Sequence, residues 1–283
     1  MSSYTNPSNK HYARRHGLFL EANELTRKES RSGYGDAWGC GDTVEALALG
    51  YWEDIGNKVL VVINHVEKEI KYLPYRTRFD GDYGKRIAKK LSKIGYTEGI
   101  FVTYTLNPNL FPSLYEAYKS EMEGFNKMIT AVRKRYPNFK GYVRVVEFQE
   151  NGNPHIHVLL FGVDFIPVEW MRELWEKHYR LGTQINVKRI DNQKGAIRYL
   201  MKYLLKAFKG EDSEEAKKAF RQKALLWALN SRGWAVSKSL LSLISDRPTQ
   251  TQSSGFWVFL GAFSKDCVKF SYFEFLEWAG FVT

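Results

Sequence analysis

Cysteine and long apolar runs are what this 283-residue sequence lacks most. Cys40 and Cys267 lie far apart and have no neighbours at zinc-ligand spacing, which excludes a disulfide framework and a cysteine zinc site and agrees with a reducing compartment. No apolar stretch approaches the ~20 residues that a membrane-spanning helix needs, and the first residues contain no signal-peptide core. We therefore expect a cytoplasmic globular protein without a membrane partner.

Acidic residues are also in the minority. The sequence has 31 Asp and Glu against 42 Lys and Arg, a formal net charge of +11. A basic excess favours a polyanionic partner such as nucleic acid, because phosphate binding releases counterions. A lysine-rich surface of the thermophile type gives the same balance. Composition alone does not separate these two interpretations.

Three regions differ in pattern. Residues 1–97 predict no particular fold. Their basic start, KHYARRHGLF, suits either an arm on a phosphate backbone or a frayed terminus, and β-branched runs at 58–63 and near 68 can add strands to the core. A short basic helix is expected over 86–94. Residues 98–210 form the core, and 211–283 a mainly helical C-terminal extension that opens with a capped amphipathic helix.

The core region alternates strand and helix patterns. A strand, GIFVTYTLNP, ends at Asn107-Pro108, and Ser113 with Glu116 predicts the N-cap of a helix that runs to Tyr136. A hairpin over 141–162 follows, then a helix over 167–178, a strand over 183–190 and a helix over 193–209. This order predicts an α+β sandwich, with an antiparallel sheet and helices on one face.

The hairpin carries two candidate metal ligands. His155 and His157 alternate along a strand, so both point to one face. Two such imidazoles can hold one ion, preferably Mn, Zn, Ni or Co, although a hydrogen-bonded pair on a half-buried sheet is the commoner case. Glu147 joins this face if the connecting loop has an odd number of residues; a two- or four-residue loop brings Phe148 there instead. A carboxylate with two imidazoles would leave open positions on the metal.

The helix over 193–209 carries a second group of candidates. Its apolar stripe leaves four side chains on the opposite side, in two overlapping Tyr-x-x-Lys units: Tyr199, Lys202, Tyr203 and Lys206. Tyrosines spaced in this way often form a packing ladder. A phenol becomes a nucleophile when ammonium groups or a metal favour its phenolate. Basic residues around the helix would hold a DNA strand: Lys188, Arg189, Lys194, Arg198 and Lys209.

Together these motifs resemble the HUH endonucleases, which include rolling-circle replication initiators, transposases and relaxases. The resemblance rests on FVTYTLNP, on PHIH within GNPHIHVLLF, and on YLMKYLLK, in the family's order between Gly99 and about Lys209. The doubled tyrosine is similar to the two-tyrosine initiators of certain phages, plasmids and transposons.

The resemblance implies an RRM-like, ferredoxin-like sheet and a Mg²⁺- or Mn²⁺-dependent nick of single-stranded DNA at a replication origin. It also implies a 5′-phosphotyrosine intermediate and a free 3′-hydroxyl. His155, His157 and Glu147 would be the metal ligands, and Tyr199 and Tyr203 the nucleophiles. Since no helicase domain is recognised, unwinding and synthesis are expected to fall to a host helicase and polymerase.

Other functions fit part of the pattern. A transposase or relaxase shares the chemistry on another substrate. A non-catalytic RRM-like protein would use Tyr199 and Tyr203 as stacking platforms for bases. A histidine-triad nucleotide hydrolase needs a third histidine where Leu159 stands, so we set it aside.

Overall fold

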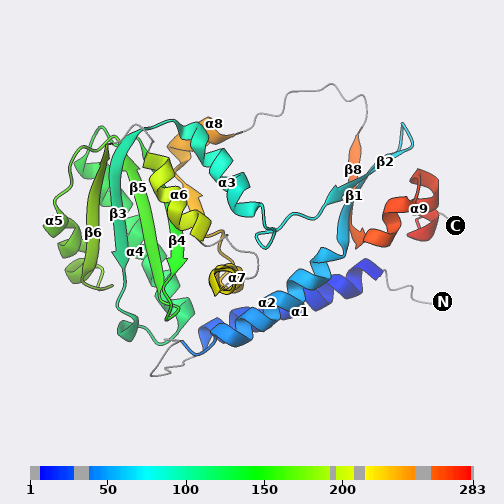
Figure 1. Cartoon of the computed structure of the whole chain (residues 1–283), viewed down its shortest axis with the longest axis horizontal. Coiled ribbons are helices and arrows are strands. Elements are labelled where there is room, and N and C mark those ends of the chain that lie inside the picture. Colours follow the sequence, from blue (N-terminus) through cyan, green and yellow to red (C-terminus); the bar gives the residue numbers. More distant parts are fainter. Residues whose placement is uncertain (1–6, 29–37, 192–195, 207–213, 246–255, 282–283) are drawn as a thin grey trace. The chain divides into compact units, whose positions relative to one another are not determined.

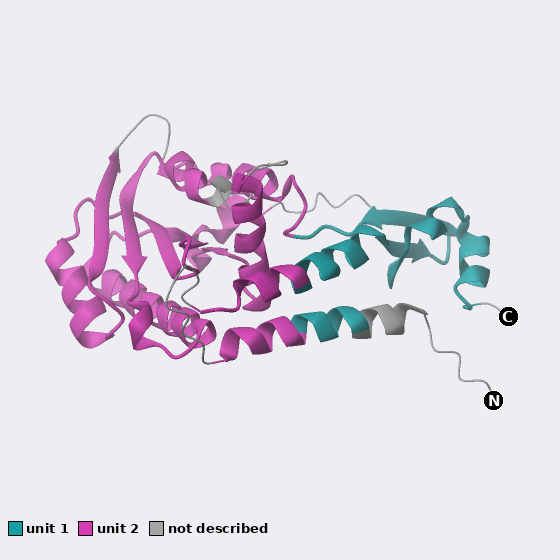
Figure 2. Ribbon diagram, turned by 60° about the horizontal axis from the view of Figure 1, so that its bottom comes forward, with its two compact units in different colours: residues 1–19, 47–77, 246–283 teal, residues 20–46, 78–245 magenta. Residues whose placement is uncertain are grey.

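The computed structural model describes residues 7–28, 38–191, 196–206, 214–245 and 256–281. The contacts divide the chain into two compact units, each treated by itself below. Unit 1 comprises residues 1–19, 47–77 and 246–283, and unit 2 comprises residues 20–46 and 78–245 (Figure 2). Helices α1 (Pro7–Arg27) and α2 (Gly41–Gly56) contribute residues to both units. Residues 7–27 are thus helical, where the sequence suggested an arm or a frayed terminus.

Unit 2 is built on a five-stranded antiparallel sheet in the order β6-β3-β5-β4-β7 (Figure 1). Its strands are β3 (Glu98–Thr105), β4 (Gly141–Phe148), β5 (Pro154–Phe161), β6 (Gln184–Asp191) and the short edge strand β7 (Trp234–Val236). Helix α4 (Leu114–Arg135) connects β3 to β4, and α5 (Val168–Arg172), with its π-helical continuation Glu173–His178, connects β5 to β6. The order β-α-β-β-α-β is that of a ferredoxin-like fold. The predicted α+β class and antiparallel sheet are confirmed.

Helices cover both faces of this sheet, rather than one as the sequence suggested. On the first face, Phe125 of α4 and Trp175 pack against the buried ring of Tyr104, with ring centroids 6.4 and 4.7 Å away. On the second face, a core cluster joins the sheet to α3 (Tyr83–Leu91), α6 (Ala196–Lys206) and α8 (Leu241–Ile244). The histidine hairpin presents its polar side chains to this second face.

Local sequence signals explain where these elements begin. The Ser113 side chain accepts a hydrogen bond from the Glu116 backbone N–H at 3.3 Å, as an N-cap does, and α4 starts at the next residue. In the hairpin, the Gln149 N–H donates to the Asn153 carbonyl at 2.9 Å and Gly152 has a φ of 78°. That backbone conformation favours glycine, so Gly152 sets the length of the turn.

Unit 1 contains a smaller sheet in the order β2-β1-β8, from β1 (Lys58–Asn64), β2 (Glu69–Pro74) and β8 (Trp257–Ser264). Helix α9 (Tyr272–Trp278) packs on one face of it through Phe275, around the buried residues Val61 and Ile63. The strands expected at 58–63 and near 68 exist, and they pair with each other and with β8. Among the described helices of the chain, none is both long and apolar enough to cross a membrane.

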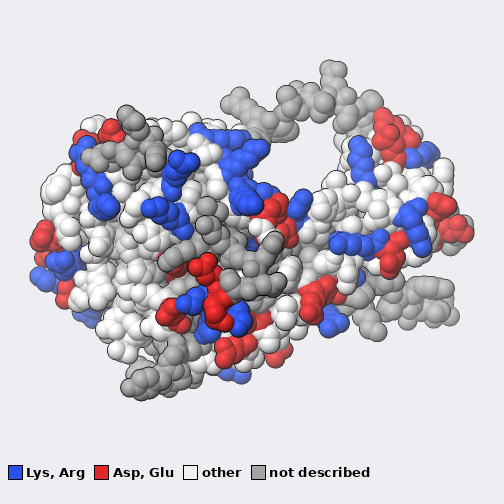
Figure 3. Space-filling model, in the orientation of Figure 1, with Lys and Arg blue, Asp and Glu red and all other residues white. Residues whose placement is uncertain are grey.

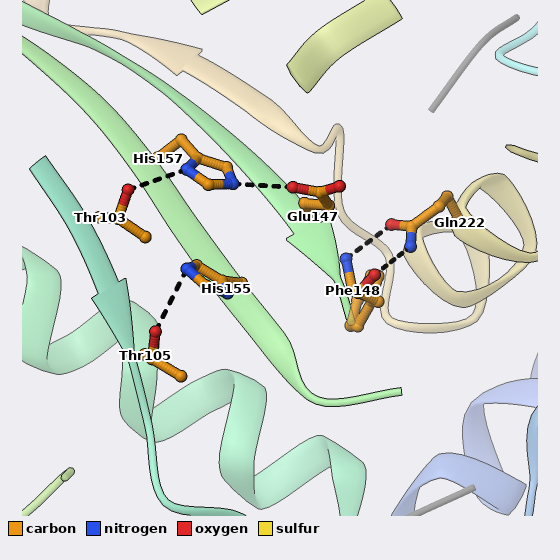
Figure 4. A network of polar contacts seen from close by, with 7 residues as sticks. All are labelled: Thr103, Thr105, Glu147, Phe148, His155, His157 and Gln222. Atoms are coloured by element: carbon orange, nitrogen blue, oxygen red, sulfur yellow. Dashed lines mark hydrogen bonds and ion pairs between the residues drawn. The ribbon is translucent and has the colours of Figure 1, made fainter. Parts of the chain in front are cut away.

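Helix α7 (Glu214–Ala228) belongs to unit 2 and lies beside the end of β4. The Gln222 side-chain oxygen accepts a hydrogen bond from the Phe148 backbone N–H at 2.6 Å, and its amide nitrogen donates to the Phe148 carbonyl (Figure 4). Strand β7 pairs with β4 only over Val143 to Val145. Gln222 therefore continues the pairing of β4 at its carboxyl end, next to Glu147.

Candidate functional site

Strand register places the hairpin's polar side chains together. Glu147 lies directly opposite His155, because the loop pairs Gln149 with Asn153 and leaves three residues, 150–152, between them. The loop thus has an odd number of residues, which is the condition under which Glu147 shares a face with both histidines, and the alternative that brings Phe148 there is excluded. On the other side of β5, Thr103 pairs with His157 and Thr105 with His155. The five side chains form one polar row across three strands (Figure 4).

His157 is held from both sides of its ring. Its Nε2 lies 2.8 Å from the Glu147 carboxylate and its Nδ1 lies 3.1 Å from the Thr103 hydroxyl. A carboxylate only accepts, so Nε2 donates to Glu147, and either Nδ1 or the Thr103 hydroxyl can be the donor of the second hydrogen bond. The Thr103 hydroxyl can accept as well as donate. It therefore also suits the other tautomer, in which Nδ1 donates to Thr103 and Nε2 keeps a free lone pair. The contacts of His157 therefore allow both its present hydrogen bond and metal ligation.

His155 is neutral in this environment. Burial, followed by the neighbouring His157, lowers its pKa from 6.5 to about 4, against the opposing effect of Glu147. The two imidazole rings stack with centroids 4.8 Å apart. Nε2 of His155 lies 3.2 Å from the Thr105 hydroxyl. A neutral imidazole keeps the lone pair that a metal ligand requires.

The donor set can be compared with what a divalent ion needs. Two imidazoles and a carboxylate are suitable ligands for Mn²⁺ and acceptable for Mg²⁺. In the arrangement described here, however, no three His, Cys, Asp or Glu side chains among the described residues are placed to hold an ion. Figure 4 shows His155 turned toward Thr105 and away from Glu147. The residue types suit a divalent ion, and all three side chains could hold one ion only with the His155 ring in another orientation.

Helix α6 covers this row with aromatic rings. Ile197, Leu200 and Met201 face the core cluster, and the two tyrosines pack against its edge. The ring of Tyr203 stacks on that of His157, with centroids 3.8 Å apart. Phe101 of β3 contacts both tyrosines, at 4.8 Å from Tyr199 and 5.3 Å from Tyr203. The sheet histidines and the helix tyrosines, far apart in the chain, thus form one site.

The two tyrosines differ in environment. Burial raises the pKa of Tyr203 to about 12, with the hydrogen bond and proximity of Tyr199 and the charge of Glu147 acting in the same direction. The ammonium groups of Lys188 and Lys202 instead lie over the ring of Tyr199, at 5.3 and 5.2 Å from its centroid. The cationic surroundings expected for both tyrosines are present at Tyr199, whereas Tyr203 is held as a neutral phenol.

The other basic residues that the sequence predicted to surround the tyrosine helix lie in different places. Arg198 is exposed on α6. Arg189 pairs with Ile100, on the face opposite Lys188, and lies 3.4 Å from the Asp164 carbonyl and 3.9 Å from Glu98. It is therefore not part of the tyrosine site. Lys194 and Lys209 fall outside the described residues, as does the side chain of Lys206.

Several residues of the site were not singled out from the sequence. Thr103, Thr105 and Phe101 share a face of β3, and the alternation of FVTYT was the signal that could have placed them beside the histidines. Gln222 was also missed. It acts on Phe148 from a helix 74 residues further along the chain, and no local pattern marks it.

Comparison with known proteins finds a family match over the region that contains these residues. Residues 99–208 match a family model described as a replication-associated protein of the ORF2 type. A curated protein, "Uncharacterized protein 1" of Halorubrum pleomorphic virus 1, is 26% identical over 256 residues, and the match covers 72% of this chain and 50% of the relative. The chain thus spans about half the length of the curated relative it matches. No solved structure matches. The family match, which contains both the histidine hairpin and the tyrosine helix, supports a replication-associated role for unit 2.

Proposed function

We propose that this protein is a rolling-circle replication initiator that nicks and rejoins single-stranded DNA through a phosphotyrosine intermediate. The observation that carries the proposal is the position of α6, whose two tyrosines contact the sheet face bearing Glu147, His155 and His157. A replication-associated family match over the same residues supports the same conclusion. A host helicase and polymerase would then act on the nicked origin.

The proposed reaction is a transesterification. The oxygen of a tyrosine attacks the phosphorus of a phosphodiester, a bond forms between that oxygen and phosphorus, and the bond to the 3′ oxygen breaks. The phenolic proton is lost and the departing 3′ oxygen gains one. The DNA keeps a free 3′-hydroxyl and a 5′-phosphotyrosine link. Since one phosphate ester replaces another, the reverse reaction rejoins the strand without ATP.

The environments of the tyrosines favour Tyr199 as the first nucleophile. Lys188 and Lys202 lie beside it and would stabilise negative charge on its oxygen and on a nearby phosphate. Tyr203 has its pKa raised to about 12 by burial and would give up its proton less readily. We infer that Tyr203 accepts the strand in a second transfer, after its ring leaves His157.

His155, His157 and Glu147 would hold Mg²⁺ or Mn²⁺ at this site. Such an ion polarises a phosphodiester and stabilises the charge that develops on its oxygens. Thr103 would accept a hydrogen bond from Nδ1 of His157 and keep that ring oriented. Gln222 would hold the end of β4 in register, so that Glu147 remains opposite His155.

The test is covalent capture. The protein is incubated with Mn²⁺ and labelled single-stranded DNA of random sequence, and adducts that resist SDS are mapped to a peptide. We expect the label on Tyr199 or Tyr203, and none when both are changed to phenylalanine. Since DNA binding does not need the phenolic oxygens, the double variant should still bind. An adduct formed by the double variant would refute the mechanism.

A non-catalytic nucleic-acid-binding protein is the second candidate. The observation that favours it is the stack of Phe101, Tyr203 and His157, because aromatic rings at a sheet surface can pack against bases. This candidate predicts DNA binding with no adduct under any metal condition. The capture experiment therefore separates the two functions.

A further inference from the structure

Helix α3 is strongly amphipathic and precedes the residues that match the family model. Its buried side carries Ile87 and Leu91, followed by Ile94 in the next turn. On the other side, exposed lysines recur at every fourth residue, at Lys85 and Lys89 of α3 and at Lys93 of the 3-10 turn Ser92–Ile94 that follows it. We call these three residues the α3 lysine row.

The lysine row has a fixed position relative to the tyrosines. Ile87 and Leu91 belong to the same core cluster as Ile197, Leu200 and Met201 of α6. Tyr83, at the start of α3, accepts a hydrogen bond from the indole N–H of Trp234 at 3.2 Å. Both helices belong to unit 2. The row is therefore part of the packed framework that carries Tyr199 and Tyr203.

The basic residues of α3 differ in whether they form ion pairs. Arg86 forms ion pairs with Asp80 at 2.8 Å and Asp82 at 3.3 Å, which fixes the start of the helix. Lys85 and Lys89 have no carboxylate partner among the described residues. In Figure 3, Lys and Arg side chains gather over α3, on the side of the molecule where α6 also lies in Figure 1. Ammonium groups concentrated in this way suit a polyanion.

We propose that the α3 lysine row binds the phosphates of the single strand that enters or leaves the tyrosine site. This inference rests on the proposed function. The reaction of the proposed function acts on a single strand, and a row of exposed ammonium groups beside the tyrosine helix suits the succession of phosphates along that strand. The row would add binding energy outside the reacting phosphate and so help to position it.

The experiment measures how binding depends on salt. The parent protein carries Tyr199→Phe and Tyr203→Phe, so that no covalent link forms and binding is read independently of cleavage. The first variant adds Lys85→Gln, Lys89→Gln and Lys93→Gln, since glutamine keeps the helix propensity. The control adds Lys119→Gln, Lys127→Gln and Lys134→Gln on α4. These side chains are also exposed, and their helix covers the opposite sheet face. The probes are a labelled random single strand and a duplex of the same length.

Each phosphate contact on a single strand contributes about 0.7 to the slope of log K against log salt. We expect the α3 variant to reduce the magnitude of this slope by about 2 on the single strand, and the α4 control to leave it unchanged. Single Lys85→Gln, Lys89→Gln and Lys93→Gln variants, each expected to reduce it by about 0.7, serve if the triple variant does not fold. An unchanged slope, an equal reduction in both triples, or a reduction confined to the duplex would overturn the proposal. If the slopes are as expected but the wild-type protein forms no adduct in the capture experiment, the proposed function alone is contradicted.

Discussion

The ring of Tyr203 covers the ring of His157 at a centroid distance of 3.8 Å, which ties the tyrosine helix to the histidine strand. His157 keeps only 4% of its surface exposed beneath it. Tyr199, one turn earlier on α6, lies outside this stack beside two lysines. One tyrosine thus packs against a candidate metal ligand, while the other lies beside two ammonium groups.

This difference predicts unequal effects of the two single substitutions. Tyr199→Phe should reduce the first cleavage by at least about 10³-fold, as the loss of a nucleophile does. Tyr203→Phe should leave the first cleavage within a few-fold of wild type and block the second strand transfer. The measurement is single-turnover cleavage of a labelled strand, followed by addition of a second strand as acceptor. The reverse pattern would show that Tyr203 attacks first.

Metal removal provides a second test of the same site. A chelator should stop adduct formation, and Mn²⁺ should restore it, because in the proposed function His155, His157 and Glu147 would hold the ion beside the reacting phosphate. His155→Ala should weaken Mn²⁺ binding measured by calorimetry without DNA, a readout that does not depend on cleavage. Thr105→Val, which removes the 3.2 Å contact of His155, should leave Mn²⁺ binding intact or tighten it. Cleavage that persists in chelator would remove the histidines from the catalytic assignment.

Much of this arrangement follows from local sequence, and the rest depends on long-range packing. Alternation in FVTYT and HIHVLL specifies which side chains share a face, and the turn geometry at Gly152 fixes that Glu147 joins them. The position of α6 over His157, by contrast, follows from an apolar stripe whose partner surface is formed by three strands and α3. No sequence spacing predicts that Tyr203 stacks on a histidine while Tyr199 lies beside lysines. Gln222 is likewise visible only in the folded chain.

Gln222 offers a test of how much its hydrogen bonds to Phe148, the residue after Glu147, stabilise the end of β4. Gln222→Ala removes two hydrogen bonds from the Phe148 backbone and should lower the free energy of unfolding by about 1–3 kcal/mol, since buried peptide groups lose their partners. Gln222→Glu keeps the acceptor for the Phe148 N–H but places a carboxylate against the Phe148 carbonyl, so it should be at least as destabilising. Urea unfolding measures the free energy of unfolding of both variants. Exposed Lys217→Gln on the same helix is the control, with an expected change within about 0.5 kcal/mol.

A buried carboxyl group on the other sheet face predicts how stability depends on pH. Glu121 of α4 is fully buried, and burial raises its pKa well above the usual 4.5, against the lowering effects of Arg144 and the Ile156 backbone. Because the folded-state pKa is raised, the native state binds the proton more tightly than the unfolded state. The stabilisation is complete below the unfolded-state pKa, near 4.5, and is lost as the pH rises toward the folded-state pKa.

The contribution of Glu121 to the unfolding free energy should therefore fall by about 1.4 kcal/mol per pH unit above its unfolded-state pKa. Glu121→Gln cannot ionise and should remove this dependence. The variant should be more stable than wild type at a pH of about 8 and gain little at a pH of about 4. Denaturant unfolding between these two pH values gives the difference directly. A wild type and variant whose stability curves stay parallel across this range would mean that Glu121 has the same pKa in the folded and unfolded states.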